Sequence, residues 1–358
     1  MNHTSERPLF IEQIRAESGS RPPLRLARRP KPVLPPLEPS DAHEVFTVCT
    51  GNRWMELAER EPEPKMLFGE FWRQGEICIL FADTNVGKSV LAVQIANSIS
   101  RHSQIRPFAL KTRSKKVLYV DFELSTQQFY TRYRDEKGNY NFNDKFIRAG
   151  FNPGADTPPD GYPYDEYVIA GIEYKIQLVG AGVLIIDNIT CLRGGIENSA
   201  VALALMTKLK ALKTRYNLSI LVLAHTPKRR NPCRPLSPDD LQGSKLIINF
   251  ADSAFAIGRS SEKKGLCYLR QIKQRSTEQV YGDDNVCLCS IKKLRGMLRF
   301  RFHGTARERD HLATPADHRR AQLPARVIQL SARGHSQRQI KQKLNVSLGL
   351  VNKLVRQA

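Results

Sequence analysis

Short apolar runs alternate with segments of helical periodicity over the middle of the chain. The runs are short enough to be strands that are buried on both faces, and they cover residues 77–81, 116–123, 183–187 and 219–224. Residues 90–96 and 199–216 instead place their apolar side chains at helical spacing. This alternation predicts an α/β fold with a mostly parallel sheet that is covered by helices on both faces.

The pattern changes beyond about residue 251, where short alternating strands replace the strand–helix repeat. We expect strands at residues 253–257, 266–272, 286–291 and 298–302, extending the sheet at one edge. Upstream of the first apolar run, residues 41–60 have helical character. Residues 135–165 are dominated by Asn, Asp, Gly and Pro, which predicts a long excursion on the surface.

The two ends of the chain differ from this central part. Residues 1–40 are rich in Pro and Arg and cannot form a core, so we interpret them as a disordered tail. Its charges suit contact with DNA phosphates, and a plain solvated tail fits them equally well. Residues 41–304 are predicted to form the main domain, residues 305–320 a charged linker, and residues 321–358 a small all-α domain.

Composition adds a partner class to this picture. The 358 residues carry a formal net charge of +21, which favours a polyanionic partner, nucleic acid before membrane, although solvated basic faces are the alternative. Seven cysteines without metal-ligand spacing suggest reduced thiols and a cytoplasmic location. We see no apolar run of membrane-spanning length and no signal-peptide core, and we expect no membrane partner.

The most informative stretch follows the first apolar run. It reads Ala82-Asp83-Thr84-Asn85-Val86-Gly87-Lys88-Ser89, between a predicted strand and a predicted helix, which is the order of a P-loop. Backbone N–H groups of such a loop hold phosphates at a helix N-terminus, so these eight residues are predicted to bind ATP. Lys88 would contact the β- and γ-phosphates, and Ser89 would bind Mg²⁺. Ala82 stands where the usual pattern has its first glycine.

Two carboxylates and one histidine follow neighbouring predicted strands. Asp187 ends an apolar run and is predicted to hold Mg²⁺, as the acidic residue of a Walker B motif does. Glu123 ends another run, where it can polarise the water that attacks the γ-phosphate. We expect strand alternation to point Asp121 to the opposite face. His225 ends a fourth run and is predicted to sense the γ-phosphate, although a lone histidine is more often structural.

Together these positions resemble the RecA-fold motors of the hexameric replicative helicase type, both DnaB-like and plasmid RepA-like. The resemblance covers roughly residues 65–300 and rests on residues 82–89, 121–123, 184–188, 224–226, 240–244 and 273–275. Several DnaB-type P-loops also begin with Ala. The resemblance implies a RecA-like P-loop NTPase in which Glu123 is the catalytic base and His225 the γ-phosphate sensor. It also implies that the segment Asp240-Leu241-Gln242-Gly243-Ser244 precedes a helix near the DNA channel.

The same resemblance implies that Lys273 and Arg275 reach the nucleotide of a neighbouring subunit. Their spacing agrees, because residues two apart at a strand end project on one side. A guanidinium near a γ-phosphate stabilises the charge of the transition state. A solvated basic strand end is the alternative. If the assignment holds, efficient hydrolysis needs a head-to-tail homo-oligomer, which we expect to be a hexamer.

The C-terminal segment has the pattern of three short helices. Ser336 and Ser347 are predicted to cap the second and third, which a short turn at Asn345 joins. The segment resembles the helix-turn-helix units of resolvases and homeodomains, and the third helix would offer Asn352, Lys353 and Arg356 to duplex DNA. A small bundle that packs on its own core is the alternative.

These expectations combine into one hypothesis with two competitors. The leading one is a Mg²⁺-dependent ATP hydrolase that encircles single-stranded DNA as a ring and unwinds or translocates in replication of a plasmid or mobile element. The second is a regulatory or recruiting ATPase that binds duplex DNA without unwinding it. The third is a recombination ATPase of RecA kind, which forms filaments.

Overall fold

The computed structural model describes residues 46–152, 154, 157–189, 199–226, 231–241 and 245–357. The chain divides into two compact units, residues 1–62 and 63–358. The first contains the helix α2 (Gly51–Arg60), whose N-cap Thr50 accepts a hydrogen bond from the Arg53 N–H at 3.2 Å. The helix therefore starts at this cap, inside the predicted helical segment 41–60, of which residues 41–45 lie outside the described residues. The predicted tail, residues 1–40, lies outside the described residues.

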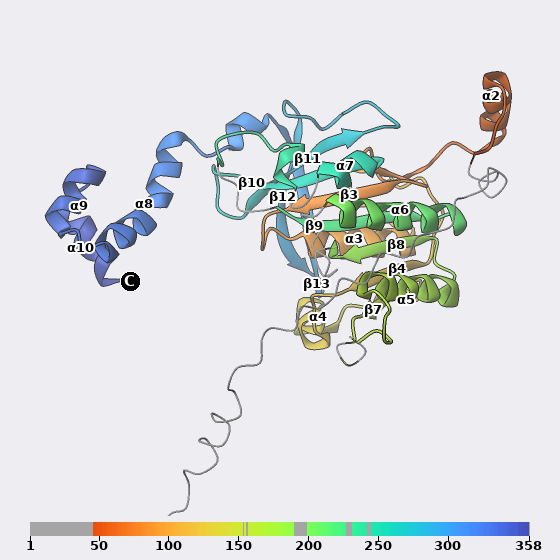
Figure 1. The fold of residues 1–358 in the computed structure, drawn as a ribbon, viewed down its shortest axis with the longest axis horizontal. Helices are drawn as coiled ribbons and strands as arrows, with labels where there is room; N and C mark the ends of the chain where they lie inside the picture. The colour runs from red at the N-terminus through yellow and green to blue at the C-terminus, as the bar shows by residue number, and fades with distance from the viewer. Residues whose placement is uncertain are drawn as a thin grey trace, which may run out of the picture. The chain divides into compact units, whose positions relative to one another are not determined.

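The second unit is built on a nine-stranded sheet with the strand order β13-β12-β11-β10-β3-β9-β8-β4-β7 (Figure 1). Six of these strands are parallel to one another: β10 (Ser253–Arg259), β3 (Ile77–Ala82), β9 (Ser219–His225), β8 (Val183–Asp187), β4 (Val117–Asp121) and β7 (Phe146–Gly150). The other three continue the sheet antiparallel beyond β10: β11 (Leu266–Gln274), β12 (Val286–Leu294) and β13 (Met297–Ala306). The predicted extension of the sheet at one edge is confirmed, with its first strand, β10, parallel to β3 and the other three antiparallel.

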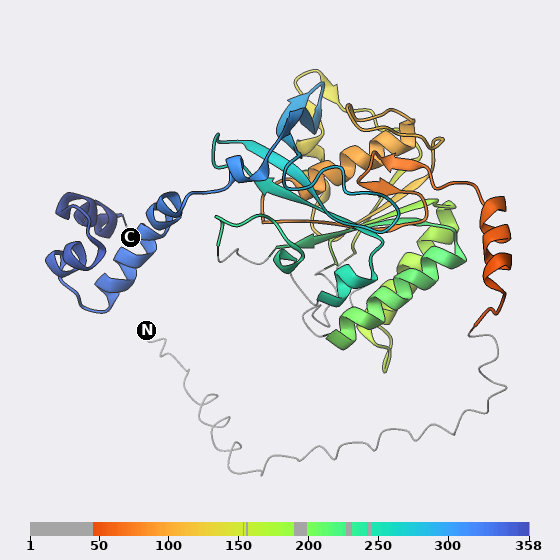
Figure 2. The same cartoon turned by 90° about the horizontal axis from the view of Figure 1, so that it is seen from above.

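Helices cover both faces of this sheet (Figure 2). On one face α3 (Lys88–Arg101) packs in a core with Leu80 of β3. On the other, α5 (Tyr164–Val179), α6 (Ser199–Arg215) and α7 (Lys245–Phe250) pack with Ile79 and Phe81. Successive residues of β3 thus serve opposite cores, which is why the strand is apolar at every position. The α/β class and the mostly parallel, doubly covered sheet are confirmed, consistent with a RecA-like P-loop fold.

The described part of residues 135–165 lies at the surface as predicted, apart from the buried Phe146, but the prediction missed a strand there. These residues contain β7, the edge strand that pairs with β4, and the paired strands β5 (Arg134–Asp135) and β6 (Gly138–Asn139) flank its start. The sequence of β7, Phe-Ile-Arg-Ala-Gly, is short and only Phe146 in it is buried. An edge strand that is mostly half-exposed leaves little hydrophobic pattern, so the polar residues around it dominated the prediction.

Smaller elements complete the second unit. A hairpin of β1 (Met66–Phe68) and β2 (Trp72–Arg73) precedes β3, and α4 (Thr126–Arg132) follows β4. The short 3₁₀ helices are η4 (Pro238–Asp240) and η5 (Glu308–His311). Among the described residues, no helix is both long and apolar enough to cross a membrane.

The C-terminal segment forms three helices: α8 (Pro315–Ala332), α9 (Gln337–Leu344) and α10 (Leu348–Arg356). Val327, Ile340 and Val351 are their buried core. Ser336 and Ser347 cap α9 and α10 as predicted. The predicted linker at 305–320 is wrong, because β13 continues to Ala306 and α8 already begins at Pro315, a residue suited to the first turn of a helix.

Candidate functional site

The P-loop lies where the sequence predicted it, between the end of β3 at Ala82 and the start of α3 at Lys88. Two of its residues have left-handed backbone, Asn85 with φ of 59° and Gly87 with φ of 104°. A side chain at Gly87 would also clash, since an added Cβ would lie 2.5 Å from Ile291 Cδ1. Gly87 is therefore required both by its backbone conformation and by its close approach to β12.

The alanine at the first position of the motif has a structural explanation. Ala82 is the last residue of β3, is fully buried, and pairs with His225 on β9 and Ile257 on β10. It is not among the residues with positive φ, so its backbone does not need glycine. Of the remaining loop residues, Asp83, Thr84 and Asn85 are exposed, Val86 is buried and Ser89 is half-buried.

Lys88 is buried, and its ammonium group lies inside the loop. Its Nζ donates to the carbonyl oxygens of Ala82 at 3.0 Å and Asp83 at 3.3 Å, and lies 3.0 Å from His225 Nδ1. Burial lowers the pKa of Lys88, while the carboxylates of Glu123 and Asp187 oppose that shift. The cation is thus held by groups that an incoming phosphate can replace.

Glu123 and His225 are in direct contact beside this lysine. The Nε2 of His225 lies 3.1 Å from Glu123 Oε1. Because the Lys88 ammonium can only donate, we assign Nδ1 of His225 as the acceptor and Nε2–H as the donor to Glu123. This hydrogen bond is the main reason that the pKa of Glu123 is lowered, so Glu123 is a carboxylate at neutral pH.

Asn188 completes this polar chain, and the sequence patterns assigned it no role. Its Nδ2 contacts Glu123 Oε1 and lies 2.8 Å from His225 Nε2. It is buried and directly follows Asp187 at the end of β8. A polar residue after a Walker B carboxylate was visible in the sequence, but its two partners become neighbours only through the sheet order.

Asp187 lies at the end of β8 and is buried. Burial raises its pKa to about 6, although hydrogen bonds from Tyr119 and Ser89 oppose the shift. The Tyr119 hydroxyl donates to Oδ2 at 2.5 Å, whereas Oδ1 is buried and accepts no hydrogen bond from any described residue. Tyr119 was not identified from the sequence.

A buried, unpaired carboxylate oxygen beside a serine hydroxyl fits Mg²⁺, which binds oxygen ligands and usually takes only one or two carboxylates together with substrate phosphates. Asp187 and Ser89 are therefore the residues that would hold the ion. Among the described residues, no group of three or more His, Cys, Asp or Glu side chains lies close enough together to hold a metal ion.

Asp121 is excluded from the site, but not for the reason first expected. Strand β4 ends at Asp121, and residues two apart on a strand share a face, so alternation does not separate Asp121 from Glu123. Asp121 is instead occupied structurally: it accepts hydrogen bonds from the N–H groups of Glu123 and Leu124 and pairs with Arg148 at 2.8 Å. It shapes the turn that carries Glu123.

Arg259 is a further residue at the P-loop that the sequence did not reveal. It ends β10, two residues beyond Ile257, which pairs with Ala82. Its guanidinium donates to the carbonyl oxygen of Thr84 at 2.9 Å. Only the placement of β10 beside β3 brings this exposed cation to the loop.

Lys273 and Arg275 lie together, but away from the P-loop of their own chain. Lys273 Nζ donates to the carbonyl oxygens of Ile248 at 2.7 Å and Asn249 at 3.0 Å, and Arg275 donates to Asn249 at 2.5 Å. Both therefore hold the C-terminal end of α7. Burial, followed by the adjacent Arg275, lowers the pKa of Lys273.

The remaining predicted residues are placed as follows. Lys353 and Arg356 are exposed on α10, and Asn352 is half-buried. Asp240 is buried and accepts a hydrogen bond from the Ser237 N–H at 2.8 Å, which closes the turn of η4. Residues 242–244 of the same predicted segment lie outside the described residues.

Comparison with known proteins identifies a family for part of the chain. The AAA_25 family, described as an AAA domain, matches residues 46–231, just over half of the 358 residues. A crystal structure of a KaiC-like protein from Pyrococcus horikoshii OT3 is similar at a TM-score of 0.43 and 13% identity, covering 64% of this chain and 91% of that one. No curated protein sequence matches the chain. The matched segment includes the P-loop, Glu123, Asp187 and His225, and the chain belongs to the AAA_25 family of AAA domains.

Proposed function

We propose that this protein is a Mg²⁺-dependent ATPase that assembles head to tail into a hexameric ring on DNA and moves along it, unwinding DNA in replication of a plasmid or mobile element in the cytoplasm. Family membership implies ATP binding and hydrolysis. The motor activity, the ring and the DNA substrates are the proposal. The observation that carries it is the chain of contacts Lys88–His225–Glu123 at the P-loop.

This chain of contacts couples the phosphate position to the catalytic base. Lys88 is held by two loop carbonyls and His225, and each of these contacts must loosen for Lys88 to bind the β- and γ-phosphates. His225 then loses a partner and is free to contact the γ-phosphate. Its bond to Glu123 changes with it, which releases the carboxylate to orient the attacking water. Bound Mg²⁺ would neutralise phosphate charge from its position at Ser89 and Asp187.

The position of Arg275 supports assembly. The Arg275 N–H donates to the carbonyl of Asp252, whose own N–H donates to Ile77, so Arg275 lies level with the start of β3. The P-loop begins at the other end of that strand, five residues on, roughly 17 Å away at 3.3 Å per residue. Arg275 is thus out of reach of its own nucleotide. Its side chain is 49% exposed and pairs with Asp252 at 3.8 Å and with the Asn249 carbonyl, contacts that it would exchange for the nucleotide of a neighbouring subunit.

The three C-terminal helices support a DNA contact. In a helix-turn-helix arrangement α10 would lie in the major groove, and its exposed Lys353 and Arg356 are cations suited to phosphates or guanine. The short capped turn between α9 and α10 agrees with this arrangement. The ring would hold single-stranded DNA, and α10 would dock duplex.

The test is the ATPase rate of the full chain with no DNA, with single strands and with duplex, followed by strand displacement on a forked duplex. A DNA motor should show ATPase that single strands stimulate several-fold, and ATP-dependent displacement. Stimulation by duplex alone, without displacement, would instead favour the regulatory ATPase, for which the exposed cations of α10 are the supporting observation. Filaments rather than rings in electron micrographs would favour the recombination ATPase.

A further inference from the structure

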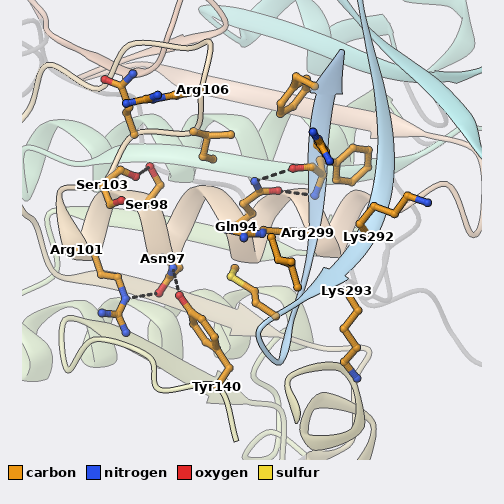
Figure 3. A pocket seen from close by; sticks show the side chains of 17 residues that line it. Gln94, Asn97, Ser98, Arg101, Ser103, Arg106, Tyr140, Lys292, Lys293 and Arg299 are labelled. Carbon is orange, nitrogen blue, oxygen red and sulfur yellow. Dashed lines mark hydrogen bonds between the residues drawn. The ribbon is translucent and has the colours of Figure 1, made fainter. Parts of the chain in front are cut away.

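A cleft of about 710 Å³ lies at the end of α3 that is remote from the P-loop. Its walls are the C-terminal half of α3 with the turn that follows, the β12–β13 hairpin, and Tyr140 (Figure 3). At about 1.5 Å per helical residue, Arg101 in this cleft lies roughly 20 Å along α3 from Lys88. None of the predicted nucleotide-site residues lines the cleft, although Phe300 on its wall also packs against Gly87 of the P-loop.

The charge of this cleft is entirely of one sign. Among the described residues, no Asp or Glu lines it, whereas six basic side chains do: Arg101, Arg106, Lys292, Lys293, Arg299 and Arg301. Figure 3 shows Arg101 and Arg106 on the wall formed by α3 and its following turn, with Lys292, Lys293 and Arg299 on the hairpin side. Cations on both sides of a cleft suit a ligand with several negative charges.

Most of these cations have no counter-charge within the protein. Arg101 bonds Asn97 and Lys293 bonds the Thr131 carbonyl, but the side chains of the other four form no hydrogen bond or ion pair with any described residue. Lys292 is the direct cross-strand partner of Arg299. Like charges opposite each other destabilise a strand pair, so this arrangement costs stability in the isolated chain and an anion would offset that cost.

The inner wall of the cleft is rigid and partly aromatic. Gln94 of α3 makes two hydrogen bonds with the backbone of Phe300 on β13, at 3.1 and 2.7 Å, which locks the hairpin to the helix. The hydroxyl of Tyr140 accepts a hydrogen bond from Asn97 at 3.0 Å, and Arg101 lies over its ring at 5.7 Å. A fixed ring beside cations is the combination that holds a base and its phosphate.

A structural role explains only part of this arrangement. A cation near the last turn of a helix interacts favourably with the helix dipole, which accounts for Arg101. It does not account for Lys292, Arg299 and Arg301, which belong to the hairpin.

We propose that this cleft binds a short stretch of single-stranded nucleic acid through its phosphodiester backbone. The cleft has the volume of a small-molecule site, which admits a few nucleotides but not a duplex. The cations are spread over two walls, which matches successive phosphates of one strand better than a single phosphate group. This strand site is additional to the ring channel and α10, and it does not depend on translocation by the protein.

The test compares two full-length double variants with the same change of charge. Lys292→Glu with Arg301→Glu removes two cleft cations, and Lys263→Glu with Lys264→Glu removes two exposed cations from the turn between β10 and β11. The probe is a fluorescent oligothymidylate, titrated at several salt concentrations. The cleft variant should bind the oligothymidylate at least about tenfold more weakly than the wild type. The slope of log K against log salt concentration should become shallower by about 1.4, because two phosphate contacts are lost. The control variant should keep the affinity and slope of the wild type.

Milder variants and a cross-linking experiment serve as controls for this test. The milder Lys292→Gln with Arg301→Gln should show an intermediate loss, and all variants should retain the DNA-free ATPase rate and thermal transition of the wild type. A photoreactive 4-thiothymidine strand should cross-link to the peptide that contains Tyr140. Equal weakening in the cleft and control variants, or cross-links confined to other segments, would overturn the proposal. So would inorganic tripolyphosphate binding that the cleft variants abolish while strand binding persists, because the cleft would then be a small-anion site.

Discussion

The two ends of helix α3 both suit phosphate, but they are built differently. At its N-terminus Lys88 is buried, loop carbonyls hold its ammonium group, and Glu123 and Asp187 lie close by. At its C-terminal half the cations are side chains of a cleft that, among the described residues, no carboxylate lines. A site that cleaves phosphate needs acids to place a base and a metal, whereas a site that only holds a polyanion gains nothing from them. The difference separates a catalytic site from a binding site.

The largest expected effect is at the N-terminal end. Lys88→Ala should lower ATP turnover by about 10³-fold or more, because the transition state loses its nearest fixed cation. The cleft variant should leave the DNA-free rate unchanged. Steady-state ATPase assays on folded proteins, checked by circular dichroism, measure both. Normal hydrolysis by a folded Lys88→Ala protein would remove the catalytic assignment of this end of α3.

Glu123→Gln should reduce turnover by about 10² to 10⁴-fold while ATP still binds, since the amide keeps the shape and loses the base. Asp121→Asn is the matched control, because Asp121 holds the turn and Arg148 rather than substrate. Asp121→Asn should lower the thermal transition temperature of the protein clearly, with a smaller effect on its ATP turnover. Single-turnover rates and nucleotide titrations separate binding from chemistry. A folded Asp121→Asn protein with the larger catalytic loss would show that the base was misassigned.

Arg275→Ala should bind ATP normally and lose turnover on the order of 10²-fold, because Arg275 lies at the far end of β3 from its own P-loop. Mixing it with Glu123→Gln should restore part of the activity, since some interfaces then pair an intact Glu123 with an intact Arg275. The measurement is ATPase across a titration of the two inactive proteins. A flat line at background, with mixed rings verified by mass, would reject the action in trans.

Removing residues 313–358 should weaken duplex binding by about tenfold and leave single-strand stimulation of the ATPase largely intact. The cut is placed before Pro315 because α8 begins there. Duplex binding of the full chain should also fall steeply with salt as counterions are released. Fluorescence anisotropy with duplex and single strands measures the two parts. An equal loss of duplex binding and of single-strand stimulation would mean that the cleft and α10 form one composite site.

The smallest effect concerns stability and Asp187. Its pKa in the folded protein is raised to about 6, so the folded state binds this proton more tightly than the unfolded state. The contribution is present below about pH 4 and is lost as the pH rises through about 6. Without Mg²⁺ and nucleotide, the free energy of unfolding of the wild type should therefore fall by about 1–3 kcal/mol more than that of Asp187→Asn between pH 4 and 7. Urea unfolding of both proteins at pH 4 and pH 7 measures this difference. An equal change in the free energy of unfolding of the wild type and of Asp187→Asn would contradict the prediction.

The site residues that the sequence did not reveal share a cause. Tyr119 on β4, Asn188 just after β8 and Arg259 on β10 contact the site, and the sequence assigned none of them a role. Each becomes a site residue only because β10, β3, β9, β8 and β4 lie side by side. Strand β7 was missed because an edge strand buries too little to show a hydrophobic pattern.

The sequence by itself determined the features that depend on neighbours within a few residues. These are the P-loop between β3 and α3, the capping serines at Ser336 and Ser347, and the apolar runs that became the central strands. These features could be predicted because turn geometry, helix capping and hydrophobic periodicity depend on residues that are close together in the sequence.

Only the tertiary structure decided which distant residues meet. It placed Glu123, His225 and Lys88 in one chain of contacts, and it set Arg101 opposite Lys292 across the basic cleft. It also turned Asp121 toward Arg148 and put Arg275 at the far end of β3. The physical reason is that strand order is set by burying both faces of the sheet at once, a condition that no single stretch of sequence contains.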